Sequence, residues 1–328
     1  MPVAVVTGAG GYVGRFLVDC LLAQGVRVRA VSRSSLSARE GLEMSRANVF
    51  SVSELKPVFQ GADVVFHLVA HAHDASGKDN LDLQQRVTFG STQAAISAAE
   101  AAEVTGFVFA SSVAVYGKTG ETRASEESPY QPTTPYGRAK VRSEEALRAY
   151  AERTGAFASC VQPPLIYGAG CPGNLQRMVR AVRSGVFPPI PDFHNRRSMI
   201  GVTDVVRALV RAWRANVRGG RSFIVTDGVE YSTRQIYDLI RSELGKGRAP
   251  FSLPRTVFDV AAAFGDAVLS FSGRRLPFDG QVMESLAGSS VFSADRARHE
   301  LGFSPTTRLQ DAMSDIVRDC DKDKTTHQ

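Results

Sequence analysis

A glycine-rich turn directly follows the first apolar run of the chain and restricts the folds open to it. The run Val-Ala-Val-Val at residues 3–6 is typical of a buried β-strand, and Thr-Gly-Ala-Gly-Gly-Tyr-Val-Gly occupies residues 7–14. An amphipathic helix is expected next, over residues 12–24. Such a turn lets backbone N–H groups come close to a diphosphate, and the helix N-terminus adds partial positive charge. The turn therefore predicts a dinucleotide site formed by Gly8, Gly10, Gly11, Tyr12, Val13 and Gly14.

Short apolar runs alternate with helical patterns through the first half of the chain. Further strands are expected at residues 26–31, 63–69, 107–110 and 157–161, and further helices at 81–103 and 136–153. This alternation is typical of βαβ units, so the expected fold class is α/β, with a Rossmann-type doubly wound parallel sheet.

The composition and the pattern of the sequence change after about residue 162, where prolines cluster and the predicted helices become shorter. We therefore expect a dinucleotide-binding core over residues 1–165, to which residues from about 195 to 230 return. A smaller mixed α/β lobe, mainly over 166–318, is expected to bind the substrate. The last residues, 319–328, are polar and are expected to form a flexible tail.

The basic charge of the chain is local. Lys and Arg number 39 against 33 Asp and Glu, a net charge of +6, whereas residues 173–221 hold ten arginines against two aspartates. Because this local excess is larger than the net charge of the whole chain, a nucleic-acid-binding protein is not expected. The arginines at helical spacing (177, 180, 183, 207, 211, 214 and 218) should lie on solvated helix faces. Arg196 and Arg197 fall in a predicted loop and are candidates for binding a ligand phosphate.

The composition excludes several other classes of protein. Hydrophobic residues make up 43% and charged residues 22% of the 328, which are ordinary globular values. No apolar stretch reaches the roughly 20 residues of a membrane span, so no membrane insertion is expected. The four cysteines lie far apart and follow no metal-binding spacing, and no targeting segment is visible. A cytoplasmic protein without a metal site is the expectation.

The end of the second predicted strand bears on the choice of dinucleotide. An acidic residue there selects NAD, and an arginine accommodates the 2′-phosphate of NADP. The strand ends at Val31 and is followed by Ser32 and Arg33, with no acid. Arg33 can pair with a phosphate through two hydrogen bonds, and Ser32 or Ser34 can donate a hydrogen bond to it, so NADP is favoured over NAD.

Three polar residues are candidates for the chemistry. Ser112 comes just after the predicted strand at 107–110, and Tyr136 and Lys140 open the predicted helix at 136–153. Tyr136 and Lys140 are four residues apart and share one face of that helix. A nearby ammonium group and a positive nicotinamide both favour a phenolate, so we expect Tyr136 to act as an acid and base.

In these motifs the chain resembles the extended short-chain dehydrogenase/reductase family, in its nucleotide-sugar epimerase/dehydratase branch. The matching stretches are TGAGGYVG (7–14), DVVFHLVA (63–70), FVFASSVAVYG (107–117), PYGRAK (135–140), PPLIYG (163–168), GNLQRMV (173–179), RRSMIGVTD (196–204) and FSADRARHELGFSP (292–305). The resemblance implies that Tyr136 moves the hydroxyl proton, that Ser112 polarises the same oxygen, and that Lys140 holds the nicotinamide ribose. It also implies cofactor contacts from Asn48, Val49, Leu68, Val69, Ala70 and Pro163, and substrate contacts from Asn174, Leu175 and Arg197.

The chain departs from the family pattern at several positions. An asparagine usual in the family falls at Thr88, and another falls at Leu165, which puts one substrate contact in doubt. Sugar 4,6-dehydratases carry an Asp-Glu pair where this chain has Val113 and Ala114. Since no acid is present there to protonate a leaving hydroxyl, dehydration is not expected.

Three histidines, His67, His71 and His73, lie at and beyond the predicted strand at 63–69. They are interpreted mainly as packed strand-end and loop residues. The alternative is a contact with cofactor or sugar from the crevice outside the strand ends.

The resemblance implies redox chemistry at C4 of a nucleotide sugar, with UDP-sugars as the expected ligands and a homodimer as the expected assembly. The leading hypothesis is a 4-epimerase of a UDP-hexose or UDP-N-acetylhexosamine, working through a 4-keto intermediate. An NADPH-dependent reductase of a 4-keto sugar nucleotide is the close alternative, and Arg33 favours it. A protein that binds a dinucleotide without catalysis is a third and weaker hypothesis.

Overall fold

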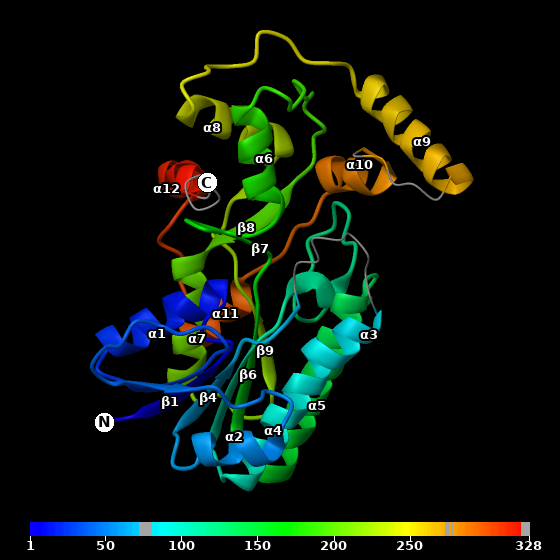
Figure 1. The fold of residues 1–328 in the computed structure, drawn as a ribbon. Helices are drawn as coiled ribbons and strands as arrows, with labels where there is room; N and C mark the ends of the chain where they lie inside the picture. The colour runs from blue at the N-terminus through cyan, green and yellow to red at the C-terminus, as the bar shows by residue number, and fades with distance from the viewer. Residues whose placement is uncertain (72–80, 273–275, 277, 323–328) are drawn as a thin grey trace.

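The computed structural model describes residues 1–71, 81–272, 276 and 278–322, and its principal element is a seven-stranded sheet (Figure 1). All neighbouring strands of this sheet are parallel, in the order β3-β2-β1-β4-β5-β6-β9. The strands are β1 (Val3–Thr7), β2 (Arg27–Val31), β3 (Leu42–Ser45), β4 (Val64–His67), β5 (Gly106–Ala110), β6 (Phe157–Gln162) and β9 (Arg221–Ile224). The strand order reverses between β1 and β4, as in doubly wound dinucleotide-binding sheets, so the predicted fold class is confirmed.

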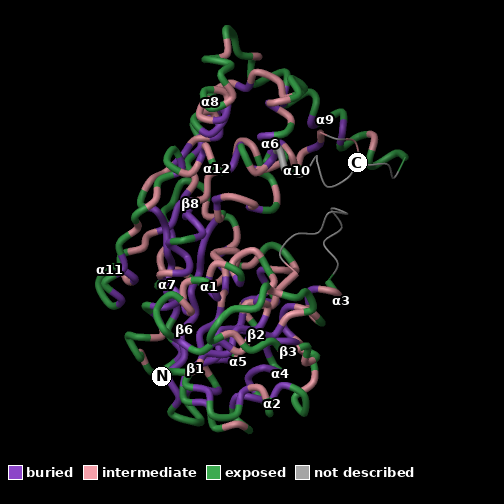
Figure 2. The backbone as a smooth tube through the Cα atoms, turned by 60° about the vertical axis from the view of Figure 1, so that its left-hand side comes forward, coloured by how far each residue is buried: buried purple, intermediate pink, exposed green. Residues whose placement is uncertain are grey.

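Helices cover both faces of this sheet. On one face α1 (Tyr12–Ala23), α7 (Val202–Arg214) and α11 (Asp295–Leu301) share an apolar core with the strands. On the other face α2 (Val52–Phe59), α4 (Ser91–Ala101) and α5 (Pro135–Thr154) form a second core. Buried residues therefore concentrate in the strands and on the helix sides that meet them (Figure 2). Burial on both faces explains why the strands are continuous apolar runs.

Local signals fix the ends of α5, the helix that carries Tyr136 and Lys140. The hydroxyl of Thr134 accepts a hydrogen bond from the backbone N–H of Gly137 at 3.0 Å, and Pro135 occupies the first turn. Gly155 ends the helix in the left-handed conformation, with φ of 71°. These are the preferred residues at helix ends, so α5 begins and ends where its own sequence directs.

The segment predicted as one helix over 81–103 is divided in three. It consists of α3 (Leu81–Gln84), a π-helical turn η1 (Gln85–Gly90) and α4. The sequence pattern also missed β3 and α2. Strand β3 has no buried residue and pairs only at the sheet edge, so its sequence lacks the apolar run by which the other strands were recognised.

A smaller lobe is built around a three-stranded sheet with the order β10-β8-β7. Strands β7 (Leu165–Tyr167) and β8 (Arg197–Gly201) are parallel, and β10 (Glu230–Tyr231) is antiparallel to β8, so this sheet is mixed. The accompanying helices are α6 (Asn174–Arg183), α8 (Thr233–Glu243), α9 (Arg255–Ser272), α10 (Gly280–Ala287) and α12 (Leu309–Lys322). Between β8 and β10 the chain returns to the large sheet through α7 and β9.

The division into a core and a substrate lobe stays a prediction. The boundary predicted for the terminal tail, residue 319, falls inside α12, where Cys320 is buried. Residues 323–328 lie outside the described part of the chain.

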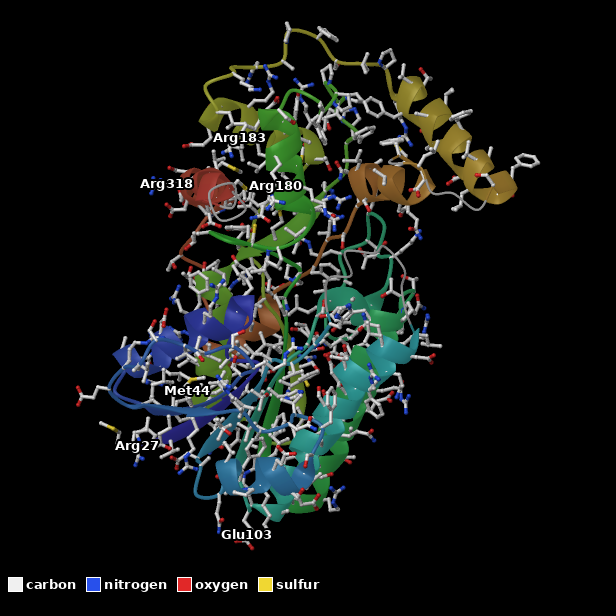
Figure 3. The ribbon with its side chains drawn as sticks, in the orientation of Figure 1. Arg27, Met44, Glu103, Arg180, Arg183 and Arg318 are labelled. Atoms are coloured by element: carbon white, nitrogen blue, oxygen red, sulfur yellow. The ribbon has the colours of Figure 1, made fainter. Side chains whose placement is uncertain are left out.

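Two arginines expected on solvated helix faces also hold neighbouring elements together. The guanidinium of Arg183 on α6 donates a hydrogen bond to the carbonyl of Val317 on α12 at 2.6 Å (Figure 3). Similarly, Arg211 on α7 donates to the carbonyl of Leu301 at 3.1 Å. Arg211 is exposed as expected, whereas Arg183 is only partly exposed. Helical spacing does not reveal which neighbouring chain carbonyls lie beyond a helix face.

Candidate functional site

A cavity of about 790 Å³ lies at the carboxyl ends of the central strands, between the large sheet and the smaller lobe. The predicted site residues that line it are Gly8, Gly11, Tyr12, Val13, Gly14, Leu68, Ala70, Ser112, Tyr136, Lys140, Pro163, Asn174 and Leu175. The predicted residues outside its wall are Gly10, Ser32, Arg33, Asn48, Val49, Val69 and Arg197. In doubly wound sheets this crevice is where ligands bind.

The glycine turn leaves no room for side chains. A Cβ atom at Gly14 would lie 2.3 Å from the carbonyl oxygen of Gly8, and one at Gly10 would lie 2.4 Å from the hydroxyl of Ser32. No side chain of the described residues caps the N-terminus of α1, so its amide groups can bind an anion. The turn therefore fits the diphosphate of a dinucleotide, as the sequence predicted.

The residues predicted to meet the adenosine end lie beyond the cavity wall, after β2 and β3. Ser32 is partly buried, and its hydroxyl accepts a hydrogen bond from the backbone N–H of Ser34 at 3.1 Å. Arg33 and Asn48 are exposed. The side-chain oxygen of Asn48 accepts a hydrogen bond from the backbone N–H of Phe50 at 3.1 Å. Arg33 is thus accessible to a ligand phosphate at the surface.

Ser112, Tyr136 and Lys140 come together from two neighbouring elements. Ser112 follows β5, and its side chain is hydrogen-bonded to that of Tyr136 in the first turn of α5. The Nζ of Lys140 lies 5.6 Å from the centre of the Tyr136 ring and donates a hydrogen bond to the carbonyl of Ala110 at 2.6 Å. The structure thus brings the three predicted residues into one wall of the cavity.

Burial dominates the electrostatics of this group. It raises the pKa of Tyr136 to about 12, while the hydrogen bond from Ser112 opposes that shift. Burial also lowers the pKa of Lys140 to about 7. The sequence argument, in which the ammonium group and a positive nicotinamide lower the pKa of Tyr136, is corrected for the ammonium group, because burial of the phenol is the largest influence on its pKa.

A buried carboxylate behind Lys140 was not singled out from the sequence. Glu144 lies one turn further along α5, is fully buried and raises the pKa of Lys140 against the effect of burial. Its oxygens accept hydrogen bonds from the hydroxyls of Ser111, Tyr130 and Ser222 and from the amide of Gln162. The spacing of Lys140 and Glu144 by four residues was the available signal.

The histidines after β4 differ in their surroundings. His67 is fully buried, with its Nδ1 2.7 Å from the hydroxyl of Thr7, and burial lowers its pKa to about 3. It is therefore a neutral, packed strand-end residue, as its main interpretation held. His71 instead lines the cavity. His73 lies outside the described residues.

The two loop arginines are used differently. Arg196 pairs with Glu230 at 3.1 Å on the surface. Arg197 opens β8, donates a hydrogen bond to the carbonyl of Gly288 at 2.8 Å, and is largely withdrawn from water, which lowers its pKa. Its Nε is buried without a hydrogen-bond partner among the described residues. Arg197 thus keeps a free donor, although it does not line the cavity.

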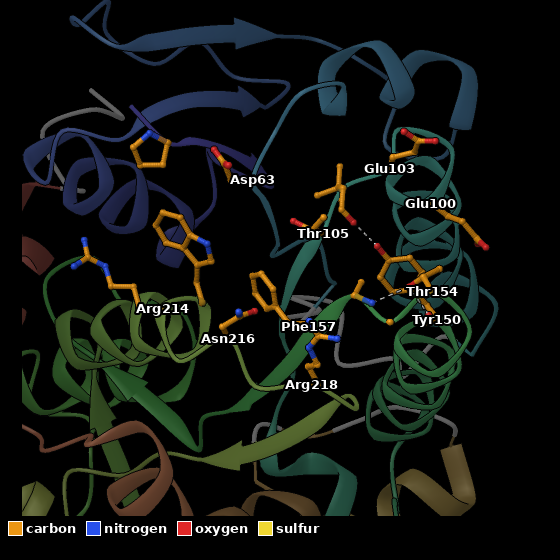
Figure 4. Close-up of a pocket in the computed structure, with 15 residues that line it drawn as sticks. Asp63, Glu100, Glu103, Thr105, Tyr150, Thr154, Phe157, Arg214, Asn216 and Arg218 are labelled. Atoms are coloured by element: carbon orange, nitrogen blue, oxygen red, sulfur yellow. Dashed lines mark hydrogen bonds between the residues drawn. The ribbon is translucent and has the colours of Figure 1, made fainter.

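A second cavity of about 760 Å³ lies at the amino ends of β1, β4, β5 and β6 and contains no predicted site residue (Figure 4). Asp63, Phe157 and Arg218 are among its lining residues, and Tyr150 there donates a hydrogen bond to the carbonyl of Val104 at 2.8 Å. In the described part of the chain, no three His, Cys, Asp or Glu side chains gather to hold a metal ion. None of the described helices has the length and apolar character needed to cross a membrane.

The parallel sheet, the glycine turn at its switch point and the cavity beyond it define a Rossmann-type dinucleotide-binding protein. The profile of the "NAD dependent epimerase/dehydratase family" matches residues 4–225. The chain therefore belongs to that family, which confirms the resemblance seen in the motifs.

The relatives differ from one another in the activities for which they are named. The UDP-glucose 4-epimerase of Mycolicibacterium smegmatis is 31% identical over 274 residues, which cover 76% of this chain and 86% of that protein. The 4-hydroxy-2-methyl-3-oxo-4-farnesyl-3,4-dihydroquinoline-1-oxide ketoreductase of Stigmatella aurantiaca is 26% identical, covering 94% of this chain and 93% of its own. Among solved structures, MoeE5 in complex with UDP-glucose and NAD is 24% identical and has a TM-score of 0.77 over 98% of this chain and 99% of its own. That structure shows a shared fold.

Proposed function

We propose that the protein performs NAD(P)-dependent redox chemistry at C4 of a nucleotide sugar, as a 4-epimerase of a UDP-hexose or UDP-N-acetylhexosamine. The observation that carries this proposal is the convergence of Ser112, Tyr136 and Lys140 in one cavity with the glycine turn. The relatives named UDP-glucose 4-epimerase and the fold shared with a UDP-glucose complex support the choice of sugar nucleotide.

The glycine turn would hold the diphosphate of the cofactor, and Lys140 its nicotinamide ribose. The chemistry that a bound nicotinamide would supply is reversible hydride transfer to and from C4 of the sugar. Tyr136, as the phenolate, takes the proton of the 4-hydroxyl, and the hydroxyl of Ser112 donates a hydrogen bond to the same oxygen. For this step the charges of Lys140 and of a bound nicotinamide have to offset the burial that raises the pKa of Tyr136.

In an epimerase the 4-keto sugar must present its other face before it is reduced. The nucleotide therefore has to stay bound while the sugar turns. Asn174 and Leu175, at the start of α6 in the cavity wall, are assigned to the nucleotide base, and Arg197 to the diphosphate. The buried Nε of Arg197, which has no hydrogen-bond partner in the part of the chain that the structure describes, supports an anionic ligand on that side chain.

The second candidate is an NADPH-dependent 4-keto-sugar-nucleotide reductase, in which Tyr136 only donates a proton. Exposed Arg33 after β2 favours it, since a consumed reductant is usually NADPH. The ketoreductase relative shows that a similar chain can perform a net reduction.

The two reactions differ in whether the nicotinamide is consumed. A 4-epimerase interconverts UDP-glucose and UDP-galactose, or their N-acetylated forms, with no lasting change in reduced-nicotinamide absorbance. A reductase consumes NADPH only when a keto sugar nucleotide is added.

We expect Tyr136→Phe to lower kcat by at least about a hundredfold, the contribution typical of a positioned acid or base. Tyr237→Phe on α8, away from the cavity wall, is the control; retained turnover in Tyr136→Phe would contradict both reactions.

We further propose that Arg33 gives a preference for NADP. In that case Arg33→Ala weakens NADP binding by about tenfold, and leaves NAD binding within about twofold, because only the 2′-phosphate contact is lost. Arg27→Ala, at the other end of β2 (Figure 3), is the matched control for loss of charge on the same strand. Equal effects of Arg33→Ala on both dinucleotides would contradict the proposed preference.

We also infer a cytoplasmic homodimer, from the family resemblance and from the cysteines, which form no disulfide bond in the described part of the chain. Light scattering of the purified protein measures the assembly; a monomer at micromolar concentration would contradict it.

A further inference from the structure

His71 is held at the cavity wall by side chains of the neighbouring helix. Its backbone N–H donates to the hydroxyl of Thr88 at 3.3 Å, and its carbonyl accepts from the amide of Gln84 at 2.7 Å. The hydroxyl of Thr88 in turn donates to the side-chain oxygen of Gln84 at 2.9 Å. Because Gln84 and Thr88 are both buried, the backbone of His71 has a fixed position at the end of β4.

The imidazole of His71 has an unused polar atom. His71 lines the same cavity as Ser112 and Tyr136, and the Nε2 of its ring is shielded from solvent without a hydrogen-bond partner among the described residues. A buried polar atom without a partner is rare and costs free energy. A ligand in the cavity would supply the missing partner.

The position of His71 favours the substrate over the cofactor diphosphate. Leu68 and Val69 lie against the glycine turn, since a Cβ at Gly8 would be 3.1 Å from the backbone of each. His71 is further along the chain and is fixed instead to the helical segment that contains Gln84 and Thr88, on the side of α5.

The π-helical turn η1 within that segment is itself tied to α5, the helix of Tyr136. Arg142 of α5 donates a hydrogen bond to the side-chain oxygen of Gln85 at 2.5 Å, and its guanidinium lies 4.0 Å from the centre of the Phe89 ring. These contacts fix His71 and Tyr136 relative to each other. π-Helical turns of this kind occur frequently at functional sites.

We propose that His71 is a substrate-binding residue, whose Nε2 forms a hydrogen bond with a hydroxyl group of the bound sugar. The inference rests on the proposed function and adds a sugar contact to it. Gln84 and Thr88 are then positioning residues, which act through His71.

The test compares ligands with and without the sugar. The background is the NAD-loaded Tyr136→Phe enzyme, in which turnover is suppressed. Calorimetry measures the Kd of UDP-glucose and the Kd of UDP for this enzyme and for the same enzyme that also carries His71→Ala. We expect His71→Ala to weaken the binding of UDP-glucose by about tenfold and the binding of UDP by less than about twofold. This difference corresponds to the loss of one hydrogen bond to the sugar. His71→Gln places an amide nitrogen near the position of Nε2 and should restore most of the affinity, whereas His71→Asn is too short.

Two further variants separate a contact from a structural role. Thr88→Val removes the hydroxyl that accepts from the N–H of His71 while keeping the side-chain volume, so the KM for UDP-glucose should rise by about threefold with kcat little changed. His299→Ala, on the exposed surface of α11, controls for the loss of an imidazole. Thermal unfolding of each variant shows whether it is folded. If His71→Ala does not fold, the comparison is made with His71→Gln.

The outcomes distinguish this inference from the proposed function. If the unmodified enzyme turns over a UDP-sugar while His71→Ala binds UDP-glucose and UDP with unchanged affinities, only the role of His71 is overturned. Equal weakening of UDP-glucose and UDP, or loss of NAD binding, also overturns it, because His71 would then serve the nucleotide or the cofactor. If the unmodified enzyme with NAD neither binds nor converts any UDP-sugar, the proposed function fails, and the sugar contact fails with it.

Discussion

Lys140 and His67 are fully buried near the carboxyl ends of β4 and β5, and Tyr136 beside them is half-buried. Burial disfavours the charged form of each group, so it moves the pKa of the phenol upward and those of the amine and the imidazole downward. The carboxylate of Glu144 opposes this effect at Lys140. The ionisation of the site is therefore set by residues that surround it rather than by the motif alone.

His67 provides a pH-dependent measure of this burial. Its pKa is about 3 in the folded protein against an ordinary value of 6.5, so between these values only the unfolded chain binds the proton. The free energy of unfolding therefore falls as the pH falls from 6.5 toward 3, by up to about 1.4 kcal/mol per pH unit. Between pH 7 and 5 this amounts to roughly 2 kcal/mol.

Between pH 7 and pH 5 we expect the free energy of unfolding of His67→Asn to fall by roughly 2 kcal/mol less than that of the unmodified protein. Urea unfolding at pH 7 and pH 5 measures the difference. His299→Asn, at an exposed histidine, should follow the unmodified protein. An unchanged pH dependence in His67→Asn would show that His67 is accessible to protons in the folded state.

At the scale of elements, the β1–α1 unit depends on close backbone approach. Gly14 lies in the first turn of α1, against the carbonyls of Gly8 and Ala9, and the missing side chain brings helix and turn together. In contrast, Gly90 of η1 has its nearest neighbour 3.6 Å from the position of a Cβ, which is an ordinary contact. Two helical glycines in one chain thus have different reasons for being tolerated.

Gly14→Ala should displace the turn from α1, because the added Cβ meets backbone atoms that cannot move independently. We expect NAD binding to weaken by at least about tenfold and stability to fall by about 1–3 kcal/mol, the usual effect of overpacking. Gly90→Ala should leave NAD binding unchanged. Fluorescence titration with NAD and a thermal melt measure both effects, and unaltered binding by Gly14→Ala would rule out the close approach as the basis of the dinucleotide site.

At the scale of the whole molecule, the large sheet and the smaller lobe are joined by buried polar contacts. Asp204 at the start of α7 is fully buried and accepts hydrogen bonds from the backbone N–H groups of Thr306 and Thr307, at 3.0 and 2.9 Å. Arg207 pairs with the same carboxylate at 2.7 Å. This cluster fixes the segment that leads from α11 on the sheet to α12 on the lobe.

Asp204→Ala leaves these donors without an acceptor, so we expect it to lower the free energy of unfolding by about 3–5 kcal/mol. Asp315→Ala on α12 removes an exposed carboxylate paired with Arg318 at 3.3 Å, and should change stability by less than about 0.5 kcal/mol. Chemical denaturation of the two variants gives the comparison. Equal effects would mean that the Asp204 cluster does not join the two parts.

The sequence by itself determined the features that depend on neighbouring residues. These are the glycine turn between β1 and α1, the alternation of strands and helices, and the shared helix face of Tyr136 and Lys140. Each is a local pattern, because the spacing of a turn or of a helix is set within a few residues.

Only the tertiary structure decided what those residues meet. The carboxylate of Glu144 gathers donors from Tyr130, Gln162 and Ser222, and His71 is fixed by a helical turn that the sequence pattern did not reveal. Burial raises the pKa of Tyr136, and Arg183 donates a hydrogen bond to a carbonyl of α12. Burial and hydrogen-bond partners arise from segments that are far apart along the chain, so no local spacing can encode them.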